Sequence, residues 1–436
     1  MSEATRNDWV VQTLGELTEA RRGITYSSAM LEPQEKGLPY VNMKSFLKGG
    51  GFNSNGTKRY AGIYDQNDLV GERDLLIANT DVTAGDIVGV PALLPNELCA
   101  NKVLYSHHVT RLRLTSGVTV PFLYYLLCLP EYRSHMLRIA RGTTVLMLDM
   151  HAIKRIPIRA PKAKAEQDRI AEILSTLDEA IVQTETLIAK HQQIKAGLMH
   201  DLFTRGVTPD GHLRPTREQA PDLYKESKIG WIPREWDVKL LGYLAEIVSG
   251  VTLGAKGEIS DEVGVPYLRV ANVQDGYFEL TEVKTIQVSR SQFEKLQLRY
   301  GDVLMNEGGD FDKLGRGSVW REEIKPCIHQ NHVFRVRPRG GKLRSYFLAF
   351  WSQSEMGKKY FVLNSKQSTN LASINSTQLN RFPVALPSAI EQERIETRIV
   401  ALNRYADSLE QEHAKLRQQK HGLMHDLLSG KVRVQQ

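Results

Sequence analysis

The strongest constraint on the fold is that one half of the chain repeats the other. Residues 9–15 (WVVQTLG) return as residues 236–242 (WDVKLLG), an offset of 227. Residues 197–202 (GLMHDL) recur letter for letter as residues 422–427. Repeating units of solenoid proteins are about 20 to 50 residues long. A period this long therefore indicates two copies of a whole domain arrangement.

Within each copy the residue pattern changes once, from mixed short runs to a long helical repeat. About 150 residues mix short β-type runs with frequent Gly and Pro, which favours a compact domain of helices and sheets. A long polar segment with helical spacing follows, at 166–203 and again at 391–428. Its apolar residues recur four and three apart over five heptads, which is typical of a coiled coil. The predicted seam residues are Ile170, Leu174, Leu177, Ile181, Ile188, Leu198, Leu202, Ile395, Ile399, Leu402, Leu409, Leu416, Leu423 and Leu427.

The fold class that we predict is α+β: two globular α/β domains in tandem, separated by two long helices that pack as an antiparallel coiled coil. The seam alone does not fix the orientation, but two equivalent arms related by a pseudo-twofold axis would pair antiparallel. Ser388 and Glu391 predict a capping box before the second helix, and Gly206 and Gly430 are expected helix stops. The expected boundaries are 1–160, 161–205 (helix), 206–235 (Pro/Gly-rich connector), 236–387 and 388–436 (helix).

Charge and cysteine content narrow the function classes. With 57 Lys+Arg the net charge is +7, which favours polyanionic partners such as nucleic acid. Three widely separated cysteines form no CxxC pair, so a disulfide scaffold is excluded and a reducing, cytoplasmic location is expected. Neither a signal peptide nor a run of about 18 apolar residues occurs, so we expect no membrane segment.

We find no motif for catalysis. No lysine that follows a glycine is followed by Ser or Thr, as a phosphate-binding P-loop requires. His329 and His332 would point to opposite faces of a strand. His421 and His425 have a spacing that a metal could use, but the first copy has Ala196 in place of His421. We therefore expect no catalytic residue and no metal site in this chain.

Several short motifs, in this order and twice over, carry a family resemblance. They are residues 229–236 (IGWIPREW), 265–270 (VPYLRV), 301–304 (GDVL), 330–332 (QNH), 166–170 (EQDRI) and 391–395 (EQERI). Together they resemble the specificity subunits of type I restriction-modification systems, over nearly the whole chain.

The resemblance implies a DNA-reading subunit without catalysis of its own. Each globular part would be a target recognition domain for one half of a split site in double-stranded DNA, and the long helices would be the spacer. Two methyltransferase subunits would dock and possibly restriction subunits as well. S-adenosylmethionine would belong to the methyltransferase, with no cofactor in this chain. Residues 79–81 (NTD) stand where the second copy has 307–309 (EGG), so we expect the half-sites to differ.

Candidate DNA contacts are polar residues of loops that occupy matching places but differ in sequence. They are Arg21, Arg22, Lys44, Lys58, Arg59, Arg141, Thr143 and Thr144 in the first copy, and Lys256, Arg269, Asn272, Asp310, Lys313, Arg316, Lys366, Gln367 and Asn370 in the second. Arg269 has a second interpretation as a structural ion-pair partner. On the helices, Leu187, Ala189 and Leu409 are expected to face outward and help to hold the methyltransferase.

Two other classes of function stay open from the residues alone. One is a self-contained methyltransferase or nuclease, for which no motif is present. The other is a coiled-coil scaffold that binds only proteins, which would show no salt-dependent, sequence-selective affinity for DNA.

Overall fold

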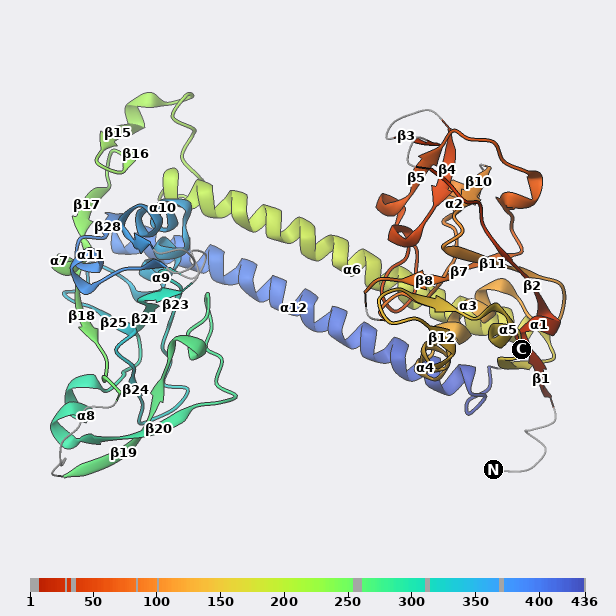
Figure 1. Cartoon of the computed structure of the whole chain (residues 1–436). Helices are drawn as coiled ribbons and strands as arrows, with labels where there is room; N and C mark the ends of the chain where they lie inside the picture. Colours follow the sequence, from red (N-terminus) through yellow and green to blue (C-terminus); the bar gives the residue numbers. More distant parts are fainter. Residues whose placement is uncertain are drawn as a thin grey trace. The chain divides into compact units, whose positions relative to one another are not determined.

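A computed structural model describes residues 8–27, 30–32, 37–83, 85–99, 102–253, 261–309, 314–367 and 372–434. The chain forms two compact units (Figure 1). Unit 1 contains residues 1–186 and 411–436, and unit 2 contains residues 187–410. Helix α6 (Lys164–Thr204) and helix α12 (Ala389–Leu428) contribute to both units.

Unit 1 is built from short strands and short helices. Its strands are β1 (Trp9–Thr13), β2 (Thr18–Arg22), β3 (Leu31–Glu32), β4 (Leu38–Val41), β5 (Lys58–Tyr60), β6 (Leu69–Val70), β7 (Asp74–Ala78), β8 (Thr80–Asp81), β9 (Pro91–Ala92), β10 (Val103–Tyr105), β11 (Val109–Leu114), β12 (Ala140–Arg141), β13 (Leu146–Leu148) and β14 (Pro157–Pro161). Its helices are α1 (Leu14–Leu17), α2 (Asn96–Cys99), α3 (Val120–Cys128), α4 (Pro130–Ile139) and α5 (Met150–Lys154).

Unit 2 repeats this plan. Its strands are β15 (Tyr224–Ser227), β16 (Gly230–Pro233), β17 (Asp237–Leu240), β18 (Ala245–Ser249), β19 (Glu262–Leu268), β20 (Lys284–Ser289), β21 (Val303–Asn306), β22 (Gly308–Gly309), β23 (Gly317–Val319), β24 (Ile328–His329), β25 (Val333–Pro338), β26 (Lys366–Gln367), β27 (Ala372–Ser373) and β28 (Pro383–Leu386). Its helices are α7 (Leu241–Leu244), α8 (Arg290–Leu296), α9 (Ser345–Gln353), α10 (Glu355–Asn364) and α11 (Ser376–Asn380).

Three of the sheets in each unit confirm the duplication, whereas the five-stranded sheet β3-β5-β4-β10-β6 of unit 1 has a three-stranded counterpart, β20-β19-β24, in unit 2. The antiparallel four-stranded sheet β2-β11-β7-β9 of unit 1 corresponds to β18-β25-β21-β23 of unit 2. The pair β1-β14 corresponds to β17-β28, and the three-stranded sheet β12-β13-β8 corresponds to β26-β27-β22. The hairpin β15-β16 lies in the connector, between the two copies.

The two long helices pack together antiparallel, as predicted. In unit 1, the start of α6 and the end of α12 enter one core, through Ile170 and Leu427. In unit 2, the start of α12 and the end of α6 enter another, through Ile395 and Leu202. Every predicted seam residue is buried or half-buried. The seam also contains His191, whose Nε2 lies 2.9 Å from the Leu402 carbonyl oxygen.

Three details of the helices differ from or refine the prediction. Leu409 does not face outward, because it is only 5% exposed and lies in the seam. Gly206 and Gly430 end their helices with φ of +66° and +72°, as predicted for helix stops. The capping box is half formed: the Glu391 amide donates to Ser388 Oγ at 3.3 Å, but the carboxylate turns to Arg214 instead. A buried guanidinium outcompetes the backbone amide for that carboxylate.

No helix in the described part of the chain is both long and apolar enough to cross a membrane.

Candidate nucleic-acid interface

The repeated Asp of the GDVL-type motif has a structural role in both units. Asp74 accepts two hydrogen bonds from Arg113 on the neighbouring strand β11, both 2.9 Å long. Asp302 accepts the equivalent pair from Arg337 on β25, at 2.6 and 2.8 Å. Both carboxylates are buried, so this two-bond pairing compensates their loss of hydration. The motif recurs because it holds the central sheet of each unit together.

The histidine pairs give no metal site in the described residues. His329 is fully buried on β24, whereas His332 is exposed in the turn before β25, so the two do not share the one strand that the sequence predicted. The ring of His332 lies 2.6 Å from the Glu307 carboxylate. Burial lowers the pKa of His329 to about 4. No group of three His, Cys, Asp or Glu side chains in the described ranges could hold a metal ion.

One group of candidate residues in unit 1 gathers at the hairpin β12-β13. Arg141 on β12 is 82% exposed and lies 2.6 Å from Asp149. Thr143 and Thr144 are exposed in the turn that follows. Arg22, from the distant strand β2, donates to the carbonyl of Leu148 on β13 at 3.4 Å. These four residues therefore share one exposed surface.

A second group of unit 1 candidates lies around β5. Lys58 and Arg59 are exposed on that strand, and Arg59 donates to the Gly37 carbonyl at 2.9 Å. Lys44 is exposed on a single 3-10 turn, and its carbonyl accepts from Asn53 at 2.9 Å. Arg21 stands apart from both groups, because it pairs with Asp68 at 2.9 Å.

In unit 2, Lys366 and Gln367 fall on the equivalent sheet, whereas Arg316 precedes a strand of the four-stranded sheet. Lys366 is exposed on β26, the counterpart of β12, and Gln367 pairs through its backbone with Ala372 on β27. Arg316 is half-buried just before β23, and its carbonyl accepts from the Asn306 amide at 2.9 Å. Lys256, Asp310, Lys313 and Asn370 lie outside the described residues.

Two unit 2 candidates are engaged inside the protein. Asn272 is 2% exposed, and its amide donates to the carbonyls of Glu279 and Glu282 at 2.9 Å each. Arg269 is half-buried and lies 3.4 Å from the Glu282 carboxylate, which favours its second interpretation as a structural ion-pair partner. Because neither group is available to a base edge, both are left out of the proposal below.

The sequence analysis missed exposed apolar side chains on the same sheet of unit 1. Val82 follows β8 and is 73% exposed, Val145 precedes β13 and Met147 lies on it. The runs that contain these residues are too short for their alternation to show which side chains face solvent. Such side chains suit contact with the methyl group of thymine.

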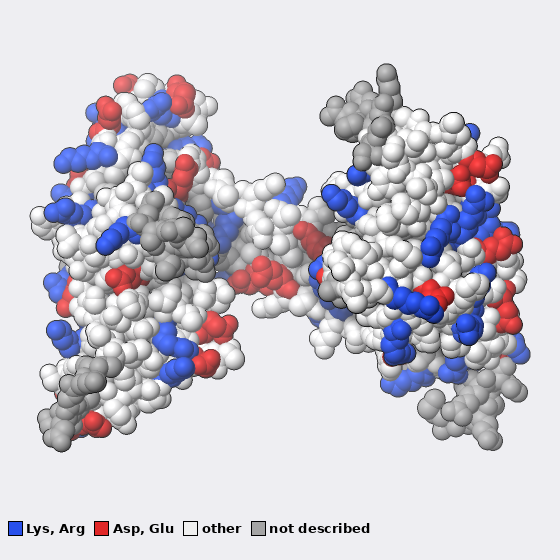
Figure 2. Space-filling model, viewed as in Figure 1, with Lys and Arg blue, Asp and Glu red and all other residues white. Residues whose placement is uncertain are grey.

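The distribution of charge is compatible with a phosphate backbone as partner. On the face drawn in Figure 2, Lys and Arg side chains are spread over each unit among neutral and acidic ones. The net charge of +7 adds a long-range attraction for polyanions that weakens with salt.

Comparisons with known proteins agree with this arrangement. A family model described as type I restriction modification DNA specificity domain matches residues 6–196 and 233–418, once per copy. The chain belongs to this family. It is 24% identical over 414 residues to the type I restriction enzyme EcoBI specificity subunit of Escherichia coli, covering 93% of this chain and 81% of that one. It is 25% identical over 433 residues to the MjaVIII specificity subunit of Methanocaldococcus jannaschii, covering 98% and 93%.

A solved structure shares the fold over its whole length. The type I restriction-modification system S subunit of M. genitalium superimposes with a TM-score of 0.58 at 16% identity, covering 98% of both chains. The chain is therefore a specificity subunit of a type I restriction-modification system, with two specificity domains and two long helices that pack together.

Proposed function

We propose that this specificity subunit reads a bipartite, asymmetric target in double-stranded DNA, one half with each unit. The observation that carries the proposal is the matched pair of sheets β12-β13-β8 and β26-β27-β22. They occupy equivalent places, yet strand register matches Arg141 and Met147 in one to Lys366 and Ser373 in the other. Equivalent positions with different hydrogen-bonding side chains suit two different base sequences.

The proposal includes partners that supply the chemistry. Two methyltransferase subunits that carry S-adenosylmethionine would dock on the chain, and restriction subunits could join them. Leu187 is 47% exposed on α6 and Ala189 is exposed nearby, so both suit such docking, whereas the buried Leu409 does not.

The test is to express the chain with the methyltransferase subunit of its own system and map methylated adenines in the host genome. We expect a two-part motif with a fixed gap that disappears when this chain is omitted. Methylation that is identical without the chain, or the absence of sequence-selective DNA binding by the complex, would favour the protein-only scaffold.

Variants in the two sheets sharpen this test. Substituting Arg141, Thr143 and Thr144 by Ala should relax one half of the motif, and Lys366→Ala or Arg316→Ala the other. Methyltransferase docking should be unchanged in both cases. Lys162→Ala and Lys284→Ala are matched controls, because both lysines are exposed and neither is a candidate contact. If the unit 1 variants and the unit 2 variants relaxed the same half of the motif, the assignment of one half to each unit would be contradicted.

A further inference from the structure

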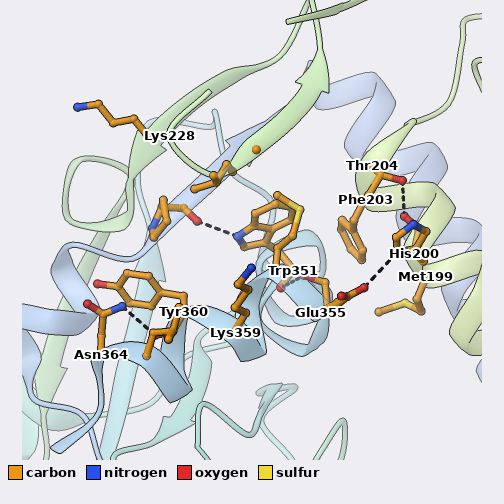
Figure 3. Close-up of a pocket in the computed structure, with 16 residues that line it drawn as sticks. Met199, His200, Phe203, Thr204, Lys228, Trp351, Glu355, Lys359, Tyr360 and Asn364 are labelled. Atoms are coloured by element: carbon orange, nitrogen blue, oxygen red, sulfur yellow. Dashed lines mark hydrogen bonds and ion pairs between the residues drawn. The ribbon is translucent and has the colours of Figure 1, made fainter. Parts of the chain in front are cut away.

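A groove opens in unit 2 between the last turns of α6 and the helix α10. Two adjoining cavities, of about 510 and 970 Å³, share the lining residues Met199, His200, Ser354, Glu355, Lys359 and Leu363. The turn of the connector hairpin β15-β16 contributes Lys228 to the first cavity (Figure 3). Three segments far apart in sequence therefore form one continuous depression.

Buried aromatic rings support the groove from beneath, and exposed aliphatic side chains lie at its mouth. Phe203 and Trp351 are each 1% exposed and pack edge to face, with ring centroids 5.5 Å apart. The Trp351 indole donates to the Pro383 carbonyl at 3.0 Å, so its N–H group is already hydrogen-bonded within the protein. At the mouth Leu363 is 71% exposed, beside the exposed Val362. This surface offers burial to apolar side chains of another molecule.

The rim of the groove is positively charged. Lys228, Lys358 and Lys359 are exposed, and among the described residues no carboxylate forms an ion pair with them. The lining also contains two acidic side chains, Asp275 and Glu355, and Glu355 lies 3.2 Å from His200 (Figure 3). The groove therefore presents an excess of lysines beside exposed apolar side chains.

We infer that this groove binds an acidic, amphipathic helical segment of a partner protein. Its apolar face would cover Val362 and Leu363, and its carboxylates would meet the lysines. A length of about three turns fits, because the ten-residue α10 along the groove is about 15 Å long. Duplex DNA would satisfy the lysines but would gain nothing from the exposed Val362 and Leu363.

Unit 1 differs at the positions equivalent to the mouth and rim of the groove, where Arg138 corresponds to Leu363 and Ser134 to Lys359. With the offset of 225 residues that relates the second parts of the copies, Trp351 corresponds to Leu126 and Tyr360 to His135. Phe203 corresponds to Leu428 at the end of the other long helix. The inference therefore concerns a segment that binds one unit only, with a stoichiometry of one segment per chain, and it does not depend on how either unit reads DNA.

The probe is a fluorescein-labelled synthetic peptide of about 12 residues, with Leu or Phe on one helical face and Glu elsewhere. Fluorescence anisotropy with the full chain should show saturable binding of one peptide per chain. The double variant Lys358→Glu with Lys359→Glu should weaken binding by about tenfold or more. Leu363→Asp should weaken it as well, and a Lys-for-Glu version of the peptide should not bind.

The matched control is Lys284→Glu with Lys342→Glu, two exposed lysines of unit 2 outside the groove, which should leave affinity unchanged. Equal loss in this control would reduce the effect to net charge and overturn the inference. The inference would also be overturned if the peptide did not bind. A third contrary result would be a 12-base-pair DNA duplex that binds the chain and loses affinity only in the groove variants, because the groove would then bind DNA.

Discussion

Unit 1 and unit 2 anchor their long helices with the same chemistry but to different depths. Glu166 near the start of α6 is bound by Arg433, which follows α12, at 2.7 and 2.9 Å. Glu391 near the start of α12 is bound by Arg214, which follows α6. The Arg214 side chain is 6% exposed, whereas that of Arg433 is 34% exposed.

The deeper anchor also carries more contacts. Glu391 accepts from the Val207 amide at 2.8 Å and from the Trp236 indole at 3.1 Å, and Arg214 reaches Glu235 at 2.6 Å. In unit 2 this network fixes the connector where the chain turns back toward the second copy. The comparison teaches that the same buried carboxylate is bound by a buried arginine in one unit and by a partly exposed arginine in the other.

Substituting each of the two arginines in turn should give the largest difference in stability between the two units. Arg214→Ala leaves a buried carboxylate without its partner, which costs roughly 3 to 5 kcal/mol. Arg433→Ala should cost less, on the order of 1 to 2 kcal/mol, because Arg433 is 34% exposed and its removal opens the Glu166 carboxylate to water. Calorimetric unfolding of the full-length variants measures both. Equal shifts in the melting temperatures would show that depth does not distinguish the two anchors.

Acid should affect unit 2 more than unit 1 through His329. Strand register places Tyr105 of unit 1 at the equivalent position. The pKa of His329 is lowered to about 4 by burial, so the unfolded chain binds a proton first as the pH falls. Stability that is complete above about pH 6.5 is then lost toward pH 4, by about 3 kcal/mol in total.

Unfolding of the full chain measured between pH 7 and pH 4.5 checks this, with His329→Phe as the comparison. The variant should lose less stability over that range than the parent chain. An unchanged pH profile would show that His329 does not carry the acid sensitivity of unit 2.

Within unit 2, two leucines test the packing of the long helices. Leu409→Ala should destabilise the chain by roughly 2 to 3 kcal/mol, because Leu409 is 5% exposed in the seam. Leu187→Ala should change stability by less than about 0.5 kcal/mol, because Leu187 is 47% exposed. Urea unfolding of both variants measures the difference, and a larger loss for Leu187 would reverse the assignment of faces.

The architecture was largely readable from the sequence because duplication and heptad spacing are long-range patterns. The seam positions, the helix stops and the place of the repeated sheets follow from them. The orientation of Leu409 was not readable, since a residue in the seam frame was also taken for an outward one. The partner of Glu391 was not readable either, because Arg214 lies 177 residues away in sequence.

The candidate contacts were harder to predict, for a physical reason. A polar side chain can be a base reader or a structural donor, and only its surroundings decide. Asn272 and Arg269 differ from Arg141 in burial and in the carbonyl and carboxylate groups that they meet, not in residue type. Matching places in the two copies selected Arg141 and Lys366 as candidates, and these two residues lie on the equivalent strands β12 and β26.

The composition of the units has a consequence for synthesis on the ribosome. Unit 2 is one continuous stretch, residues 187–410, but unit 1 needs residues 411–436 to complete its core. Those 224 intervening residues (410 − 187 + 1) take roughly 10 to 45 s to translate at about 5 to 20 residues per second. During that time Ile170 and Leu174 lack the core residue Leu427, which has not yet been synthesised. The unit whose synthesis begins first is therefore the last to complete its core. Nascent unit 1 is therefore the half that chaperones and proteases encounter with its core still open.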